Sequence, residues 1–304
     1  MDCKKVNMFD GFKLETQKFN NINIRYRIGG KGYPLLLLHG NPQTHVMWHK
    51  VAAKLSKHFT IVASDLTGYG GSGKPSTDEN FTNFTKRDMA SVKVEMMRKL
   101  GFQDFFVCGH DRGGRVAYRM ALDHSQIIKK IAVLDIIPTF DAFNLSNKEF
   151  SSGYYHWFFL SQPSPLPEKL INANPDFFWK WHTNRIKEKF FDEEALNDYL
   201  KYFRNEETVR CICDDYRAAL NVDYFHDKED KFKNKIKCPL LVLWGKKAKI
   251  EEWYDPIKIW QDWAENVTGN SIDCGHYLPE EKPDETCNHL LNFFLQLKTK
   301  EIEM

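Results

Sequence analysis

The sequence has no apolar run long enough to cross a membrane, and its net charge is small. A spanning helix needs roughly 18 or more consecutive apolar residues, and the N-terminal stretch MDCKKVNMFDGF lacks the apolar segment of a signal peptide. A formal net charge of +2 is too low for nucleic-acid or polyanion binding to be the main role. We therefore expect neither a membrane nor a nucleic acid as a partner.

Cysteine is scarce and shows no framework spacing. An odd number of thiols favours reduced cysteines in a cytoplasmic protein. The C-x-C of Cys211 and Cys213 has no second pair to complete the four ligands of a structural zinc site, and H-E-x-x-H is absent. We expect no metal and no cofactor. The seven cysteines are Cys3, Cys108, Cys211, Cys213, Cys238, Cys274 and Cys287.

What the sequence does have is a regular alternation of short apolar runs and helical patterns. Runs such as YPLLLL and FTIVASD, separated by amphipathic stretches, predict a parallel sheet covered by helices on both faces. The rhythm stops after Pro138, where aromatic-rich helices begin, and resumes at CPLLVLWG. We expect one α/β core formed by residues 1–139 and 226–304, with a helical lid at 140–225 inserted after the sixth strand.

A glycine-rich stretch, GYGGSGKP at 68–75, satisfies G-x-G-x-x-G and nearly satisfies a P-loop. The P-loop interpretation fails because Pro75 occupies the place of the hydroxyl that would hold magnesium. The dinucleotide interpretation fails because no helix begins inside the loop. A tight turn leaving the strand that ends at Asp65 is the better prediction.

The string GHDRGGR follows the apolar run DFFVC. Gly109-His110-Asp111-Arg112-Gly113 fits the nucleophile elbow G-x-S-x-G with aspartate in place of serine. Small residues permit the strained turn between strand and helix, and the backbone N–H groups of the helix start favour negative charge. Simple helix capping by Asp111 is the alternative.

Aspartate at an elbow points to attack on saturated carbon. A serine would form an ether there, which water does not cleave, whereas an aspartate forms an alkyl ester that water can hydrolyse. Carbon–halogen cleavage and epoxide opening are the reactions of this kind.

Ester hydrolysis needs a base and an acid that orients it. His276 in SIDCGHYLPEE follows the last strand, where this architecture returns a histidine to the elbow, and His39 is the second choice. Asp135, at the tip of the strand KIAVLDI, is the expected partner of the base. Glu251 and Glu252 are the alternatives, and a solvated strand end is the other interpretation of Asp135.

The segments that carry these residues resemble a known family. LLLLHGNPQTHVMWH, DLTGYGGSGKP, GHDRGGRVAYRMALDH, VLDIIPT and DCGHYLPEEKPDE are similar to the haloacetate dehalogenases of the α/β-hydrolase fold, especially those acting on fluoroacetate. The resemblance implies an eight-stranded, mostly parallel sheet with a lid after strand 6, and a homodimer. It implies Asp111 as nucleophile, His276 as base and Asp135 as its partner.

The resemblance also implies how substrate is held. Arg112 and Arg115 would clamp the carboxylate of an anionic haloacid, and the lid residues His156, Trp157 and Tyr216 would hold the leaving halide. Two guanidinium groups offset the repulsion between a nucleophilic carboxylate and an anionic substrate. Core packing of the lid residues and surface ion pairs of the arginines are the alternatives.

One position departs from the family. Asn41 follows HG where an apolar aromatic residue is expected, and haloalkane dehalogenases often carry HGNP and use this asparagine as a halide ligand. They place tryptophan after the nucleophile, however, and Arg112 has no reason to line a pocket for a neutral haloalkane. The backbone N–H groups of Asn41 and Arg112 would then form the oxyanion hole.

We therefore predict hydrolysis of a short 2-haloacid to the 2-hydroxy acid and halide. Epoxide hydrolysis is the first alternative, kept open by the lid phenols of Tyr154, Tyr155 and Tyr216, and haloalkane dehalogenation is another. A non-enzymatic binder on the same scaffold is the last, since fold does not fix function.

Overall fold

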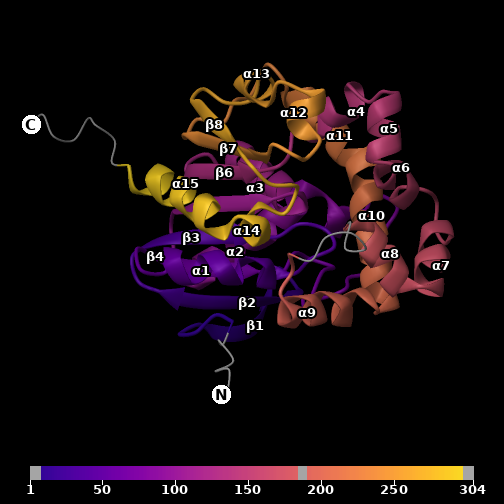
Figure 1. Cartoon of the computed structure of the whole chain (residues 1–304), viewed down its shortest axis with the longest axis horizontal. Coiled ribbons are helices and arrows are strands. Elements are labelled where there is room, and N and C mark those ends of the chain that lie inside the picture. Colours follow the sequence, from indigo (N-terminus) through magenta and orange to yellow (C-terminus); the bar gives the residue numbers. More distant parts are fainter. Residues whose placement is uncertain (1–7, 184–189, 297–304) are drawn as a thin grey trace, which may run out of the picture.

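The computed structural model describes residues 8–183 and 190–296. Its centre is an eight-stranded sheet in the order β1-β2-β4-β3-β5-β6-β7-β8 (Figure 1). The strands are Lys13–Phe19 (β1), Ile22–Gly30 (β2), Tyr33–Leu38 (β3), Phe59–Ser64 (β4), Phe105–His110 (β5), Ile128–Leu134 (β6), Leu240–Gly245 (β7) and Val267–Ile272 (β8).

The sheet is parallel except at the end formed by β1 and β2. From β4 through β3, β5, β6 and β7 to β8 every pairing is parallel, whereas β2 pairs antiparallel with both β1 and β4. Strand β7, which lies between β6 and β8, is buried throughout, while β1 buries only Phe19. The expected mostly parallel eight-stranded sheet is confirmed; β1 itself is not marked in the sequence because its side chains are mainly polar.

Helices cover both faces of this sheet (Figure 1). Helices α1 and α15 pack together on one face, and α2 and α3 pack together on the other. The core helices are α1 (His49–Leu55), α2 (Lys86–Lys99), α3 (Arg112–Asp123), α12 (Ile250–Trp253), α13 (Pro256–Gln261), α14 (Leu278–Glu281) and α15 (Pro283–Leu295), with short 3₁₀ turns η1 (His45–Trp48) and η2 (Thr82–Phe84).

The described residues between β6 and β7 are mainly helical and lie to one side of the sheet, on the right in Figure 1. It includes a π-helical turn, η3, which continues α10 into α11. Its elements are α4 (Thr139–Asn144), α5 (Lys148–Gly153), α6 (His156–Leu160), α7 (Leu166–Ala173), α8 (Pro175–His182), α9 (Glu193–Phe203), α10 (Glu206–Ala218), η3 (Ala219–Asp223) and α11 (Tyr224–Asp230).

The glycine-rich stretch forms a compact turn after β4. Gly68 and Gly70 have positive φ angles of 83° and 49°, which only glycine adopts readily. The ammonium group of Lys74 donates to the carbonyls of Gly70 and Ser72, so the lysine of the P-loop-like string is bound within its own turn.

No helix within residues 8–183 and 190–296 is long and apolar enough to span a membrane. Over the same ranges, no group of three or more His, Cys, Asp or Glu side chains has the arrangement of a metal site. The described cysteines, Cys108, Cys211, Cys213, Cys238, Cys274 and Cys287, are all free, and Cys3 lies outside the described residues.

Candidate active site

The elbow stands where β5 turns into α3. Asp111 has φ 45° and ψ −117°, a strained conformation for a residue with a side chain. The turn closes tightly because Gly109 and Gly113 have no Cβ: an added Cβ would lie 2.3 Å from the carbonyl oxygen of Gly113 and 2.4 Å from that of His39, respectively. The chain therefore projects the Asp111 carboxylate away from the sheet at the start of a helix.

The Asp111 carboxylate is held on one side only. The backbone N–H of Asn41 donates to Oδ1 at 2.8 Å, and no hydrogen bond to Oδ2 is found within the described residues. Burial raises the pKa of Asp111, but the positive charges of His276 and Arg112 and the hydrogen bond from the Asn41 N–H outweigh it, so the pKa lies below its ordinary value. An ionised carboxylate with one free oxygen is the state a nucleophile needs.

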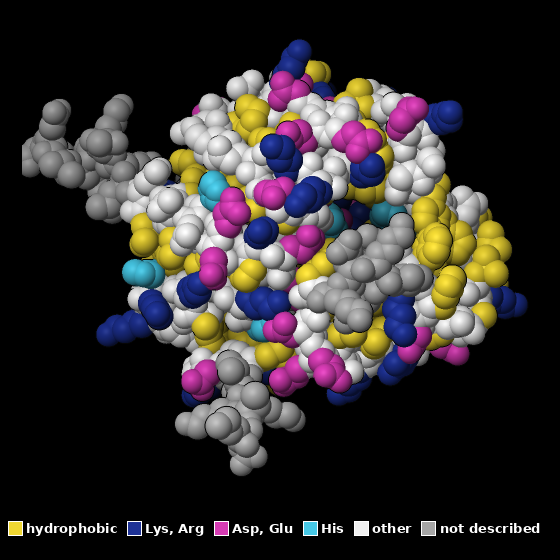
Figure 2. All heavy atoms as spheres, viewed as in Figure 1, with side chains coloured by type: hydrophobic (Ala, Val, Ile, Leu, Met, Phe, Trp, Pro, Cys, Tyr) yellow, Lys and Arg dark blue, Asp and Glu magenta, His cyan; other side chains and the backbone are white. Residues whose placement is uncertain are grey.

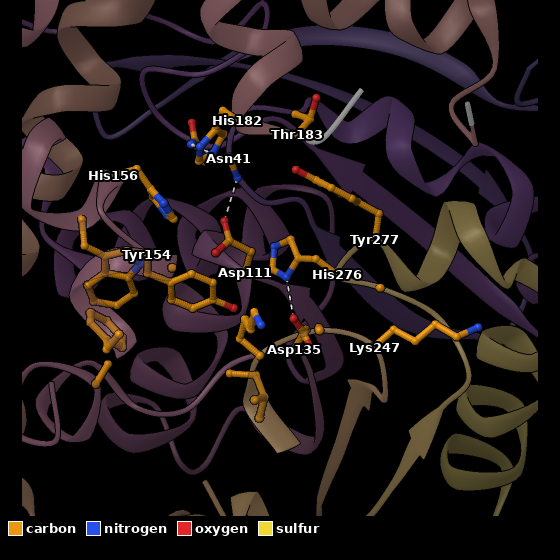
Figure 3. Close-up of a pocket in the computed structure, with 18 of the residues that line it drawn as sticks. Asn41, Asp111, Asp135, Tyr154, His156, His182, Thr183, Lys247, His276 and Tyr277 are labelled. Atoms are coloured by element: carbon orange, nitrogen blue, oxygen red, sulfur yellow. Dashed lines mark hydrogen bonds and ion pairs between the residues drawn. The ribbon is translucent and has the colours of Figure 1, made fainter. Parts of the chain in front are cut away.

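His276 lies beside Asp111 and is oriented by Asp135 (Figure 3). Its Nδ1 donates to Asp135 Oδ2 at 2.5 Å, while Asp135 Oδ1 accepts from the Gly245 N–H at 2.9 Å. Burial lowers the pKa of His276, but the hydrogen bond and charge of Asp135 and the charge of Asp111 raise it more, so the net pKa is above the ordinary value. The three side chains have the arrangement of nucleophile, base and orienting acid.

His110 is a supporting residue that the sequence did not single out. Its Nε2 donates to the backbone carbonyl of His276 at 2.8 Å, and its ring is 4.5 Å from the His276 ring between centroids. Burial lowers the pKa of His110 to about 3, so the ring is neutral. His110 thus holds the loop that carries His276. Its place directly before Asp111 was the signal available in the sequence.

The alternatives for base and acid lie elsewhere. His39 is fully buried, with Nδ1 bonded to the Gly40 carbonyl at 2.8 Å and Nε2 accepting from the Leu66 N–H at 3.0 Å. Glu251 accepts from the Trp244 indole, and Glu252 pairs with Lys249. Since Asp135 holds the His276 Nδ1, neither glutamate is its partner.

Asp111, His276 and Asp135 line a cavity of about 940 Å³ between the core and the lid. Figure 2 shows histidine side chains in a hollow on the face of the molecule that it displays. The core supplies Asn41, Asp111, Arg115, Asp135 and His276, and the lid supplies Tyr154, Tyr155, His156, Trp157, His182 and Tyr216, among others.

The two elbow arginines are placed unequally. Arg115 lines the cavity, donates from Nη1 to the Ile137 carbonyl at 2.9 Å, and makes no ion pair to a carboxylate of the described residues. Arg112 is fully buried, does not line the cavity, and is bound by Asp215. Each keeps one buried nitrogen without a partner in the described structure: Nε of Arg115 and Nη1 of Arg112.

The lid residues expected at the halide meet beside Asp111. The Trp157 ring centroid is 4.4 Å from the Arg115 guanidinium carbon, and that of Tyr216 is 4.2 Å from the Arg112 guanidinium carbon. The His156 ring is 5.9 Å from the Tyr216 ring. Burial lowers the pKa of His156 far below its ordinary value and raises that of Tyr216. Both are therefore neutral groups that can donate hydrogen bonds.

His182, at the end of α8, joins this group and was missed by sequence reasoning. The Asn41 amide nitrogen lies 3.2 Å from His182 Nε2 and 3.5 Å from the Tyr216 hydroxyl. Burial lowers the pKa of His182 to about 4, so its neutral ring accepts from the amide. Nothing in NPDFFWKWH distinguished this histidine from packing residues, because the contact joins positions 41 and 182.

Known proteins share both the fold and much of the sequence. The alpha/beta hydrolase fold model matches residues 33–283. A fluoroacetate dehalogenase from Burkholderia sp is 39% identical over 291 residues, 94% of this chain and 95% of that protein. A soluble epoxide hydrolase from Corynebacterium sp. (strain C12) is 31% identical over 288 residues, 92% of this chain and 96% of that protein.

A solved structure is similar along nearly the whole chain. A protein from Nostoc sp PCC 7120, described as an alpha/beta hydrolase, superposes with a TM-score of 0.93 at 46% identity, covering 95% of this chain and 100% of that one. These similarities include a dehalogenase and an epoxide hydrolase, so the choice of reaction depends on the site itself.

Proposed function

The chain belongs to the α/β-hydrolase fold family, and we propose that within it the protein hydrolyses the carbon–halogen bond of a short 2-haloacid, giving the 2-hydroxy acid and halide. The observation that carries this proposal is Arg115, a cation that lines the cavity together with Asp111 and makes no ion pair with a carboxylate of the described residues. A buried charge without a paired opposite charge is expensive. A substrate carboxylate in the cavity would supply that partner.

In the first step Asp111 attacks the carbon that bears the halogen. Since Oδ1 accepts from the Asn41 N–H, Oδ2 supplies the electron pair, the C–O bond forms as the carbon–halogen bond breaks, and halide departs. Arg115 holds the substrate carboxylate so that attack is in line with the leaving group. The product is an Asp111 alkyl ester.

In the second step His276 removes a proton from water, which attacks Cγ of the ester. The ester carbonyl oxygen gains charge and is stabilised by the backbone N–H groups of Asn41 and Arg112. The tetrahedral intermediate collapses by breaking the bond between Cγ and the alkyl oxygen, and the His276 imidazolium, stabilised by Asp135, gives its proton to that departing oxygen. The 2-hydroxy acid is released, the remaining carboxyl proton passes to solvent, and the Asp111 carboxylate is restored. Alkylation removes the Asp111 charge, one of the causes of the raised His276 pKa, so the base loses its proton at the stage where it is needed.

The halide leaves toward the lid. His156, Trp157 and Tyr216 are the proposed donors to its developing charge, and Asn41, bonded to His182, adds an amide N–H at the same end of the cavity. Hydrogen bonds from neutral donors to the departing halide strengthen most as negative charge develops on it, because little water competes inside such a site.

Epoxide hydrolysis is the second candidate, because Tyr154 and Tyr216 both line the cavity with Asp111. An opened epoxide leaves as an alkoxide and needs a proton. Burial, with the charge of Asp111 or Asp135, raises the pKa of both phenols, which suits a hydrogen-bond donor better than an acid. A halide needs no proton, so the haloacid is favoured.

Free halide measured after incubation with fluoroacetate or chloroacetate tests the proposal. The wild-type protein should release halide from at least one of them, and Asp111→Ala from neither. No release from either by the wild-type protein, together with turnover of a neutral styrene-type epoxide, would replace this proposal with the second candidate.

We propose a homodimer from the resemblance, and a cytoplasmic location from the cysteines, which the sequence predicts to be reduced. Light scattering of the purified protein tests the first: the mass should be that of two chains, and that of a single chain would refute it.

A further inference from the structure

The loop that carries His276 lies between β8 and α14, and one carboxylate holds it on both sides of the base. The Gly275 N–H donates to Glu281 Oε2 at 2.7 Å, and the Tyr277 N–H donates to Oε1 at 2.8 Å. Glu281 is the last residue of α14, so its side chain reaches back across that short helix. Both of its oxygens thus bind the residues directly before and directly after His276.

The fit between Glu281 and the loop is close. A Cβ at Gly275 would lie 3.0 Å from Oε1 and 3.1 Å from Oε2, so the absence of a side chain there gives the carboxylate room to approach both N–H groups. A second anchor is His110, whose Nε2 donates to the His276 carbonyl at 2.8 Å. Each of the three residues 275–277 therefore has one backbone group fixed by a side chain from outside the loop.

The His276 ring has a fixed point of its own, because Nδ1 donates to Asp135 Oδ2 at 2.5 Å. Figure 3 shows this ring between Asp135 and Asp111. With the backbone and Nδ1 both held, Nε2 has one direction left to it. Asp111 is held by a different contact, from the Asn41 N–H, so the anchoring by Glu281 bears on the base and not on the nucleophile.

The charge of Glu281 acts on the same ring. Glu281 lines the cavity together with His276. Burial lowers the pKa of His276, while the hydrogen bond and charge of Asp135 and the charges of Asp111 and Glu281 raise it. Once Asp111 is an ester it carries no charge, and Asp135 and Glu281 continue to favour the imidazolium that forms when His276 takes a proton from water.

We propose that Glu281 is a positioning residue for the second step: it holds His276 so that Nε2 meets the water that attacks the Asp111 ester. Supporting contacts of this kind keep a reacting group within the small tolerance that its chemistry allows. The first step needs no base, so Glu281 contributes little to alkylation. The inference rests on the proposed function, because both steps belong to it.

Closing the loop onto α14 for stability alone is the other role that these hydrogen bonds can have. Loss of a purely structural contact would change both chemical steps together or neither of them. Loss of a positioning contact slows ester hydrolysis and leaves ester formation near its wild-type rate. The ratio of the two rates therefore separates the two roles.

A single-turnover reaction measures both rates. The protein is used in excess over chloroacetate, the reaction is quenched in acid at successive times, and the intact mass is followed. The gain of one carboxymethyl group reports formation of the Asp111 ester, and its loss reports hydrolysis.

Glu281→Gln should form the ester within about twofold of the wild-type rate. It should hydrolyse the ester roughly tenfold more slowly, because the amide keeps one acceptor oxygen and turns an N–H toward the other peptide N–H. The ester should therefore persist longer and hold a larger fraction of the chloroacetate than in the wild-type protein.

Glu280→Gln is the matched control. Glu280 is the neighbouring residue of α14 and is buried, and its carboxylate accepts from Gln43 and Tyr199 instead of the loop that carries His276. Both of its rates should stay within about twofold of wild type. If circular dichroism shows that Glu281→Gln does not fold, Glu281→Asp decides by the same criterion, because it keeps the charge but is one methylene too short to hold both N–H groups.

Equal slowing of both steps in Glu281→Gln, or ester hydrolysis at the wild-type rate, overturns the inference and leaves the proposed function standing. A wild-type protein that releases no halide and forms no ester refutes the proposed function, and this inference with it.

Discussion

At the residue scale, Arg115 is a buried cation whose strongest polar contacts are neutral: the Ile137 carbonyl and the Thr139 hydroxyl. Burial and the charge of Arg112 lower the pKa of Arg115, which marks a cation held at a cost to stability. Arg115→Met should raise KM for a haloacetate by roughly 100-fold, because a charge-assisted contact is lost. The melting temperature should hold or rise, because a buried unpaired charge is replaced by an apolar chain of similar length.

Arg119→Met, one turn further along α3, is the control for Arg115→Met. Arg119 pairs with Asp123 and Asp230, so its loss should lower the melting temperature and leave KM near the wild-type value. Steady-state halide release gives KM, and thermal unfolding gives the melting temperature, for both variants. An unchanged KM in Arg115→Met would remove Arg115 from substrate binding.

We assign the acid limb of the pH–rate profile to His276, whose pKa is lowered by burial but raised more by Asp135 and Asp111 together. Protonated His276 cannot accept a proton from water, so ester hydrolysis should fall as pH drops through that pKa. Asp135→Asn removes the charge that favours the imidazolium, so the limb should move to lower pH. The plateau rate should also fall by roughly 100-fold or more, since the ring loses its orienting acceptor.

Profiles of kcat against pH for wild type and Asp135→Asn make this comparison. A limb that stays in place, or moves to higher pH, would show that another group titrates.

At the element scale, the loop after β3 and the elbow after β5 approach each other so closely that Gly40 is required. A Cβ at Gly40 would lie 2.6 Å from Asp111 Cβ and 2.8 Å from Oδ1. Gly40→Ala should displace the nucleophile and lower kcat by roughly 100-fold or more, as small misplacements do. Gly73→Ala is the control, since its nearest neighbours would lie at ordinary contact distance, 3.4 Å. Steady-state halide release gives kcat for both variants. A kcat equal to the wild-type value in Gly40→Ala would contradict the close packing of Gly40 against Asp111.

The elements differ in how far the sequence predicted them. Strands such as β3 and β7 are short apolar runs, so their place and the elbow after β5 could be predicted from local pattern. Strand β1 could not, because KLETQKF buries only Phe19. The lid was predicted as helical, but its division into α4 to α11 was not, because aromatic residues recur there without a clear period.

The residues of the candidate site also differ in whether the sequence could predict them. Asp111, Asp135 and His276 stand at strand ends or in the loop after the last strand, where topology brings side chains together, and they meet in the structure. His182 and Asp215 could not be predicted, because their partners Asn41 and Arg112 are more than 100 positions away and only tertiary packing joins them.

At the scale of the whole molecule, Asp227 links lid to core. On α11 it accepts from the Tyr118 hydroxyl of α3 at 2.6 Å and from the Phe140 N–H of α4 at 3.2 Å. Burial raises the pKa of Asp227 to about 7. The folded protein therefore holds a proton that the unfolded chain releases between its ordinary pKa of about 4 and pH 7, so this residue's contribution to stability falls as pH rises through that window.

Asp227→Asn removes this dependence and keeps an acceptor oxygen. Its melting temperature relative to wild type should increase between pH 5 and pH 8, by roughly 2–4 °C per kcal/mol of difference. Thermal unfolding at the two pH values measures it. An equal difference in melting temperature between the variant and wild type at pH 5 and pH 8 would show that Asp227 is ionised in the folded protein at both.

The central claim is that Asp111 becomes alkylated, and the mass of the intact protein tests it most directly. His276→Asn should complete the first step and stall before the second, because no base activates water. After exposure to chloroacetate, this variant should gain the mass of one carboxymethyl group, located on Asp111 by peptide mapping, while Asp111→Ala treated in the same way gains none there. A His276→Asn protein that stays at its unmodified mass, or carries the group only on cysteine, would contradict the account.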